Sequence, residues 1–150
     1  MSEFQVVVCQ LGPESYGLDI SSVYEIIRFQ ECTAVPASPS FVDGVINLRG
    51  RIIPVVDMAS RFGLRRSETT KSTRIIVAGT TGMRVGLVVD AVTEVLMIPE
   101  DAVEDTPNVA AGYDSAYIRG IAKLSEELVI LLDLRALFAD QIAASVAVAA

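Results

Sequence analysis

Short apolar segments alternate with turn-forming residues about every 8 to 12 positions, a pattern typical of small β-barrels and sandwiches. The segment Glu3–Leu11 is apolar at nearly every position after Phe4, which predicts a strand that is buried on both faces. Ser21 and Ser22 are predicted to cap one helical turn, and short helices are predicted from Asp57 and from Asp133. Further strands are predicted at 15–19, 23–29, 45–48, 51–56, 74–78, 84–89, 92–98, 117–123 and 128–132.

Two segments of this pattern occur twice. Residues 44–62 match residues 120–138 without a gap, at an offset of 76, with Gly, Leu, Asp and Phe in register. Residues 17–27 match residues 86–96 at an offset of 69. Two matches in the same order and at similar offsets indicate that one structural unit is used twice.

The repeat predicts two related halves, roughly 1–66 and 72–140. Each half would be marginally stable alone, so we expect them to share a core within a single domain of residues 1–150. The copies differ most at one turn, where Asn47–Arg51 in the first corresponds to Lys123–Glu127 in the second. Because the two copies share a scaffold but differ in the side chains of one turn, we interpret this turn as the part that determines specificity.

The composition is 51% apolar and 21% charged, which is typical of a globular protein. No apolar run approaches the ~20 residues that a membrane-spanning helix needs, and the first residues lack the basic segment of a secretory signal. We therefore expect a cytoplasmic protein. The two cysteines, Cys9 and Cys32, have neither metal-ligand spacing nor a disulfide framework, and are interpreted as buried free thiols.

The charges are unevenly distributed along the chain. Between Arg49 and Arg84 there are eight basic and two acidic residues, while the rest of the chain carries four basic and seventeen acidic residues. The basic window is either a solvated loop or a docking patch for an acidic protein surface. Nucleic-acid binding is a third and weaker interpretation, because the window contains a single aromatic residue, Phe62, and so offers no platform for base stacking.

Nothing in the sequence favours catalysis. The chain has no histidine, which removes the usual general base and the commonest zinc ligand. It also has no serine nucleophile elbow and no phosphate-binding loop. Asp57 and Asp133 each follow an apolar strand and precede a helical segment, so helix capping is favoured over a catalytic carboxylate pair. We expect no catalytic residue, no cofactor and no metal site.

Arg49 has two interpretations. It is either an exposed turn arginine or one member of a partly buried pair with Glu25, which a small barrel could bring close to it. In the second case we expect Arg49→Ala to leave the protein folded and to weaken binding of a partner. Such a pair serves specificity better than stability, since desolvation offsets the attraction.

At this point the sequence resembles the CheW family of coupling proteins in bacterial chemotaxis. The resemblance runs from about Phe4 to Phe138 and is most specific in FVDGVINLRGRIIPVVDM, residues 41–58. YGLDISSVYEI at 16–26 and GLVVDAVTEVL at 86–96 also fit. The resemblance implies a mainly β fold of two intertwined five-stranded SH3-like barrels, with a few short helices and a C-terminal helix.

The resemblance further implies a non-catalytic adaptor that links transmembrane chemoreceptors to the histidine kinase CheA. Its partners would be the cytoplasmic helical hairpin of the receptors and the regulatory domain of the kinase. It would reach the membrane only indirectly, through receptor arrays, and would bind no nucleic acid. Carried onto this sequence, the receptor side would comprise Val23, Glu25, Arg49, Val92 and Val95. Gly44 and Ile52 would lie at or near partner surfaces.

Other functions remain open on the sequence alone. An adaptor of the same family could serve pilus-driven motility or another chemosensory pathway. A small regulatory or nucleic-acid-binding β-barrel would use the basic window, and its binding would depend steeply on salt.

Overall fold

The computed structural model describes residues 2–36, 42–61, 68–80, 83–104, 118–124 and 127–134. The strands are β1 (Glu3–Leu11), β2 (Glu14–Asp19), β3 (Val23–Arg28), β4 (Val42–Leu48), β5 (Arg51–Asp57), β6 (Arg74–Thr80), β7 (Met83–Val89), β8 (Ala91–Pro99), β9 (Val103–Glu104), β10 (Ile118–Lys123) and β11 (Leu128–Leu132). Three short helices accompany them: η1 (Ile20–Ser22), α1 (Met58–Arg61) and η2 (Glu100–Ala102). The predicted β class is confirmed, and the predicted strands match these bounds to within a few residues.

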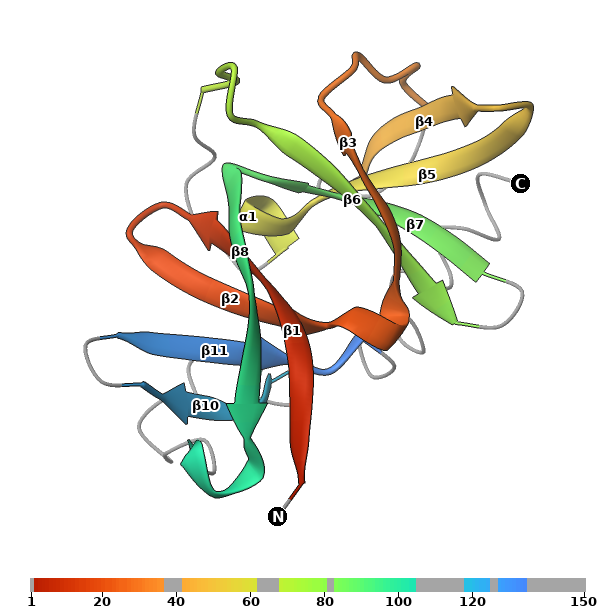
Figure 1. Cartoon of the computed structure of the whole chain (residues 1–150). Coiled ribbons are helices and arrows are strands. Elements are labelled where there is room, and N and C mark those ends of the chain that lie inside the picture. Colours follow the sequence, from red (N-terminus) through yellow and green to blue (C-terminus); the bar gives the residue numbers. More distant parts are fainter. Residues whose placement is uncertain are drawn as a thin grey trace.

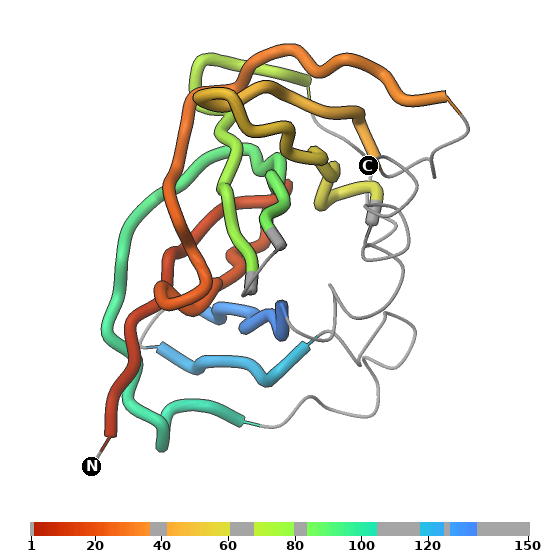
Figure 2. Tube along the Cα trace, turned by 90° about the vertical axis from the view of Figure 1, so that its right-hand side faces the viewer, coloured from red at the N-terminus to blue at the C-terminus, as the bar shows by residue number. Residues whose placement is uncertain are grey.

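The strands form two sheets that exchange elements between the two halves of the sequence (Figure 1). One sheet has the order β8-β1-β2-β11-β10-β9, and the other has the order β3-β6-β7-β5-β4. The hairpin β1–β2 therefore lies among strands of the second half, and the hairpin β6–β7 lies among strands of the first. In Figure 2 the C-terminal strands (blue) lie near the N-terminal hairpin (red), while the β4–β5 hairpin lies at the other end of the molecule.

The sequence repeat is reproduced in the register of the exchanged strands. β5 pairs with β7 in parallel, with Val55 opposite Gly86, and β11 pairs with β2 in parallel, with Leu131 opposite Gly17. These pairs are related by the same offsets, 76 and 69, that relate the two repeats in the sequence. A Cβ atom added at Gly17 would lie 2.9 Å from a methyl carbon of Leu131, so glycine allows the parallel strand to approach closely.

Each sheet curls toward closure through the chain that follows its edge strand. After β3 the chain reaches Thr33, which exchanges two backbone hydrogen bonds of 2.9 Å with Val45 of β4, the opposite edge of the same sheet. After β8 the chain forms η2 and then β9, where Glu104 lies opposite Ile121 of β10. Joining the two edges leaves few unpaired edge groups, which is the main advantage of a barrel.

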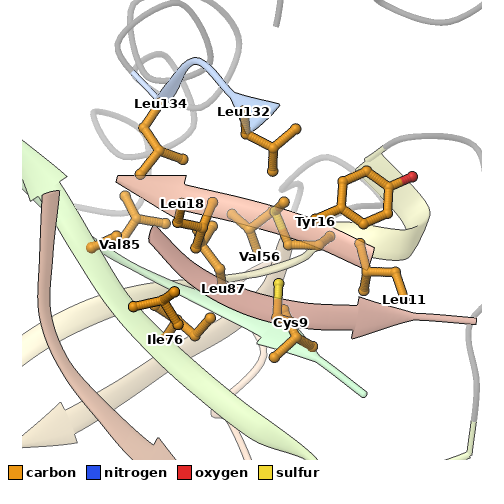
Figure 3. Close-up of a cluster of buried hydrophobic side chains, with 14 of the residues drawn as sticks. Cys9, Leu11, Tyr16, Leu18, Val56, Ile76, Val85, Leu87, Leu132 and Leu134 are labelled. Carbon is orange, nitrogen blue, oxygen red and sulfur yellow. The ribbon is translucent and has the colours of Figure 1, made fainter. Parts of the chain in front are cut away.

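A core shared by the two sheets explains why β1 is apolar on both faces. Val6 and Val8 face the interior of their own sheet, whereas Val7 and Cys9 belong to a larger cluster that also includes residues of the other sheet. Figure 3 shows this shared cluster. Its buried members are Val7, Cys9, Leu11, Tyr16, Leu18, Val42, Val56, Met58, Ala59, Ile76, Ala78, Val85, Leu87, Val89, Leu132 and Leu134.

Each sheet also encloses a smaller cluster of its own. Val6, Val8, Ile98, Ala122, Val129 and Leu131 fill one sheet. Ile46, Ile53, Val55, Ile75, Val77 and Val88 fill the other. The described residues thus form three apolar clusters, of which the shared one is the largest and joins the sheets.

Several predicted details differ from the structure. The η1 turn is capped by the side chain of Asp19, which accepts from the backbone N–H of Ser21 at 2.9 Å, rather than by Ser21 or Ser22. Among the described residues, one sheet has six strands rather than five, because the two-residue strand β9, which was not predicted, adds to its edge. The predicted helix from Asp133 falls almost entirely outside the described residues.

Candidate partner-binding surface

The turn between β4 and β5 consists of two residues in left-handed conformations. Arg49 has φ of +53° and Gly50 has φ of +83°, and Asn47 Oδ1 accepts from the Gly50 N–H at 2.9 Å. Two residues with positive φ suit the twist of an antiparallel hairpin, but the first is ordinarily Asn, Asp or Gly. Within the described residues Arg49 is the one non-glycine residue with positive φ. An arginine therefore occupies a position that the turn alone would not favour.

The Arg49 guanidinium forms a bidentate ion pair with Glu25 of β3. Arg49 Nη1 donates to Glu25 Oε1 at 2.5 Å and Nη2 donates to Oε2 at 2.7 Å. β3 and β4 lie at opposite edges of their sheet, so this pair spans the closure of the barrel. The Arg49 side chain is 71% exposed and that of Glu25 is 27% exposed, so the predicted pair forms but its arginine is mostly in solvent.

The ion pair favours the charged form of both side chains. The hydrogen bonds from Arg49 hold the pKa of the Glu25 carboxyl below its ordinary value, and the charges of Arg49 and Arg84 act in the same direction. The Arg84 guanidinium also stacks over the ring of Tyr24, 4.2 Å from its centroid. Two arginines thus act on the Glu25 carboxylate, and one of them, Arg84, stacks on an exposed tyrosine.

The other predicted site residues differ in exposure. Val23 and Val92 are partly buried and pack against the shared core, so only part of each side chain is available to a partner. Val95 is 47% exposed and Ile52 is 60% exposed. Exposed apolar side chains of this size offer contact area that solvent leaves uncovered.

Gly44 is buried, unlike the exposed members of the predicted set. Its φ is +144°, and a Cβ atom added there would lie 2.2 Å from the carbonyl oxygen of Thr33. The residue therefore allows β4 to approach the backbone that closes the barrel. Its influence on any partner surface acts through the position of β4 rather than through a side chain.

Exposed apolar residues recur at equivalent positions of the two halves. Ile26 corresponds to Val95 at the offset of 69, and Ile52 corresponds to Leu128 at the offset of 76. All four are exposed, at 39%, 47%, 60% and 58%. The site prediction omitted Ile26 and Leu128, although both fall within the matched segments. Transferring the predicted site residues Val95 and Ile52 to the other repeat would have pointed to these two positions.

The residues considered for chemistry have structural roles in the described part of the chain. Asp57 caps α1: its Oδ1 accepts from the Ala59 N–H at 3.2 Å and its Oδ2 accepts from the Ser60 hydroxyl at 2.8 Å. Cys9 is buried as predicted, whereas Cys32 is only partly buried, and neither cysteine forms a disulfide. Burial, with the nearby carboxylate of Asp90, raises the pKa of the Cys9 thiol to about 12.

Within the described residues, no group of three or more His, Cys, Asp or Glu side chains could hold a metal ion. None of the described helices has the length and apolar character that a membrane-spanning helix requires.

Comparison with known proteins accounts for nearly the whole chain. The chain is 38% identical over 134 residues to the chemotaxis protein CheW of Thermotoga maritima, covering 89% of this chain and 87% of that protein. It is 34% identical over 136 residues to the probable chemotaxis protein CheW of Rhizobium etli, covering 91% and 88%. The crystal structure of the scaffolding protein TtCheW from Thermoanaerobacter tengcongensis superposes with a TM-score of 0.82 at 41% identity, covering 89% and 86%. Since the family model for the CheW-like domain also matches residues 5–141, the chain belongs to the CheW-like domain family.

Proposed function

We propose that this chain is a non-catalytic adaptor that couples chemoreceptors to the histidine kinase CheA in bacterial chemotaxis. The observation that carries the proposal is the match, in sequence and in fold, to a protein described as a scaffold. Relatives from several bacteria carry the name chemotaxis protein CheW. An adaptor must hold two partners at once, and exposed apolar side chains occur both on β3 and β8 and at the start of β5.

The receptor partner is the cytoplasmic helical hairpin of the chemoreceptors. It packs on the side formed by β3 and β8, with Val23, Val92 and Val95 supplying apolar contact. The pair of Glu25 and Arg49 sets the register of the helices, because its bidentate geometry is fixed before the partner arrives. The partial exposure of both charged side chains supports this assignment.

The kinase partner is the regulatory domain of CheA. Ile52, at the start of β5 and 60% exposed, is the apolar contact on this side. Gly44 supports the surface indirectly by keeping β4 close to Thr33. Since the adaptor reaches the membrane through receptors, it acts in the cytoplasm and is recruited to receptor arrays.

The assignment of Arg49 to the receptor-binding surface can be tested by removing its guanidinium while keeping its turn intact. Arg49→Asn places the residue that best tolerates positive φ at this position, so the hairpin is expected to remain intact while the ion pair is lost. Binding of a receptor cytoplasmic fragment, measured by titration, should weaken. Arg51→Gln, which removes a neighbouring exposed charge, is the matched control and should bind normally. Unchanged affinity of Arg49→Asn contradicts the assignment of the receptor side.

A further inference from the structure

Two arginines face each other where β3 ends and β6 begins. Arg28 lies directly opposite Arg74 in this antiparallel pair. Like charges at directly opposed positions destabilise an antiparallel pair. Within the described ranges of the chain, neither arginine forms an ion pair with a carboxylate. The repulsion is therefore not relieved by the protein itself.

The scaffold does not require this pair. At the offset of 69, Arg28 corresponds to Met97 and Arg74 corresponds to Gln5. Gln5 and Met97 also lie opposite each other, in the pairing of β1 with β8. The equivalent strand pair in the other barrel therefore has two uncharged residues at these positions. The arginine pair is a feature of one barrel alone, retained despite its electrostatic cost.

Both arginines line a pocket of about 420 Å³ whose floor is the turn before β6. Lys71, Phe29 and neighbouring threonines also line it, and none of its lining residues in the described part of the chain is acidic. Its volume falls in the range typical of small-molecule sites. Three cations around one pocket give it a formal charge of +3.

Backbone hydrogen bonds shape this turn and orient its side chains. Thr70 N–H donates to Thr73 Oγ1 at 2.9 Å, and Ser72 N–H donates to Thr70 Oγ1 at 3.1 Å. Arg74 Nη1 donates to the carbonyl oxygens of Lys71 and Thr73 at 2.7 and 3.0 Å, which holds the guanidinium against the turn.

Two threonine hydroxyls that line the pocket have a proton to donate. Thr73 Oγ1 and Thr70 Oγ1 each accept a backbone N–H, and the hydroxyl proton of each can be donated to a ligand. Thr73 is only 5% exposed, and its hydroxyl donates to no group within the described residues. A buried hydroxyl proton without an acceptor is unusual, and a bound anion would supply the acceptor.

We propose that this pocket binds the phosphate group of a small phosphorylated ligand. A phosphate monoester carries about two negative charges at neutral pH and a diphosphate carries more. Its terminal oxygens match two arginines, one lysine and the threonine hydroxyls. A single carboxylate would leave most of the positive charge uncompensated. The volume exceeds that of phosphate alone, and Phe29 offers an apolar wall for the organic part of the ligand.

The site is tested by titrating the full chain with inorganic pyrophosphate at constant ionic strength and following backbone amides by NMR. We expect saturable shifts at residues 70–74. Arg28→Met and Arg74→Gln install the residues of the other barrel and should each weaken binding at least about tenfold, since hydrogen bonds to charged groups are the strong ones. Free Arg28→Met should be at least as stable as the unchanged protein, because the repulsion is removed. Arg74→Gln also loses the hydrogen bonds to the carbonyl oxygens of Lys71 and Thr73, so this variant is compared by its affinity alone.

Two further experiments test whether binding is specific to this pocket and whether the phosphate belongs to a lipid headgroup or to a soluble ligand. Arg51→Gln removes one charge of the same basic window outside the pocket and should leave pyrophosphate affinity nearly unchanged. Vesicles of phosphatidylcholine with phosphatidic acid test a lipid headgroup: binding that requires Arg28 and Arg74 supports the site and identifies the lipid as its source. Absence of saturable binding in both arms, or equal weakening by Arg51→Gln, overturns the proposal. Neither result affects the proposed adaptor function.

Discussion

Ile52 and Ile53 are neighbours on β5 with opposite environments, and this contrast yields a sharp prediction. Ile53 is 1% exposed and belongs to an enclosed apolar cluster, whereas Ile52 is 60% exposed. Burying a whole isoleucine side chain contributes about 1.5–3 kcal/mol. A partner that covers the exposed portion of Ile52 therefore gains about 1–2 kcal/mol, or roughly 5- to 30-fold in Kd.

Ile52→Ala should weaken binding by this factor while lowering the free energy of unfolding by about 1 kcal/mol or less, since little of the side chain is buried. Ile53→Ala is the matched control and should lower the free energy of unfolding by about 2–5 kcal/mol. Urea denaturation measures the stabilities, and titrations with the CheA regulatory domain and with a receptor cytoplasmic fragment measure binding. The reasoning is refuted if Ile52→Ala binds the CheA regulatory domain normally, or if it unfolds as readily as Ile53→Ala.

Three other results are expected. Gly44→Ala should lower the free energy of unfolding by at least about 2 kcal/mol, because its Cβ meets backbone, while Gly50→Ala, with open space around it, should cost about 1 kcal/mol; equal costs in thermal melts would contradict this. The lowered pKa of Glu25 means that its ion pair stabilises the folded state above the ordinary carboxyl pKa and that this contribution is lost as pH falls through the lowered value; an NMR titration with an ordinary midpoint would count against it. Cys32 should react with a thiol reagent at pH 8 well before Cys9, whose thiol has a pKa of about 12, and faster reaction at Cys9 would show that the core opens.

Local patterns were sufficient to predict most strands, because each combines apolar residues with clear turn residues at its ends. The run from Val6 to Val8 correctly indicated burial on both faces, and the shared core is the reason. The exchange of hairpins could not follow from local pattern, since a strand has the same periodicity whichever half it pairs with. It was expected only through the family resemblance. β9 was missed because two residues carry no periodicity.

The candidate site was predictable in part. The contact of Arg49 with Glu25 was one of two interpretations of the sequence, and the closure of the barrel decides between them. The pocket near Arg28 was not foreseen, because its turn lies at the joint between the two predicted halves, where no structural element was predicted. Its two arginines are 46 residues apart and meet only through the register of β3 with β6.

The adaptor role is tested most directly by reconstituting receptor, CheA and this protein, and measuring kinase autophosphorylation with and without the protein. The account predicts that receptor control of the kinase appears only when this chain is present, and that Ile52→Ala needs a higher concentration to restore it. Kinase activity that responds to the receptor equally well without the chain would contradict the account.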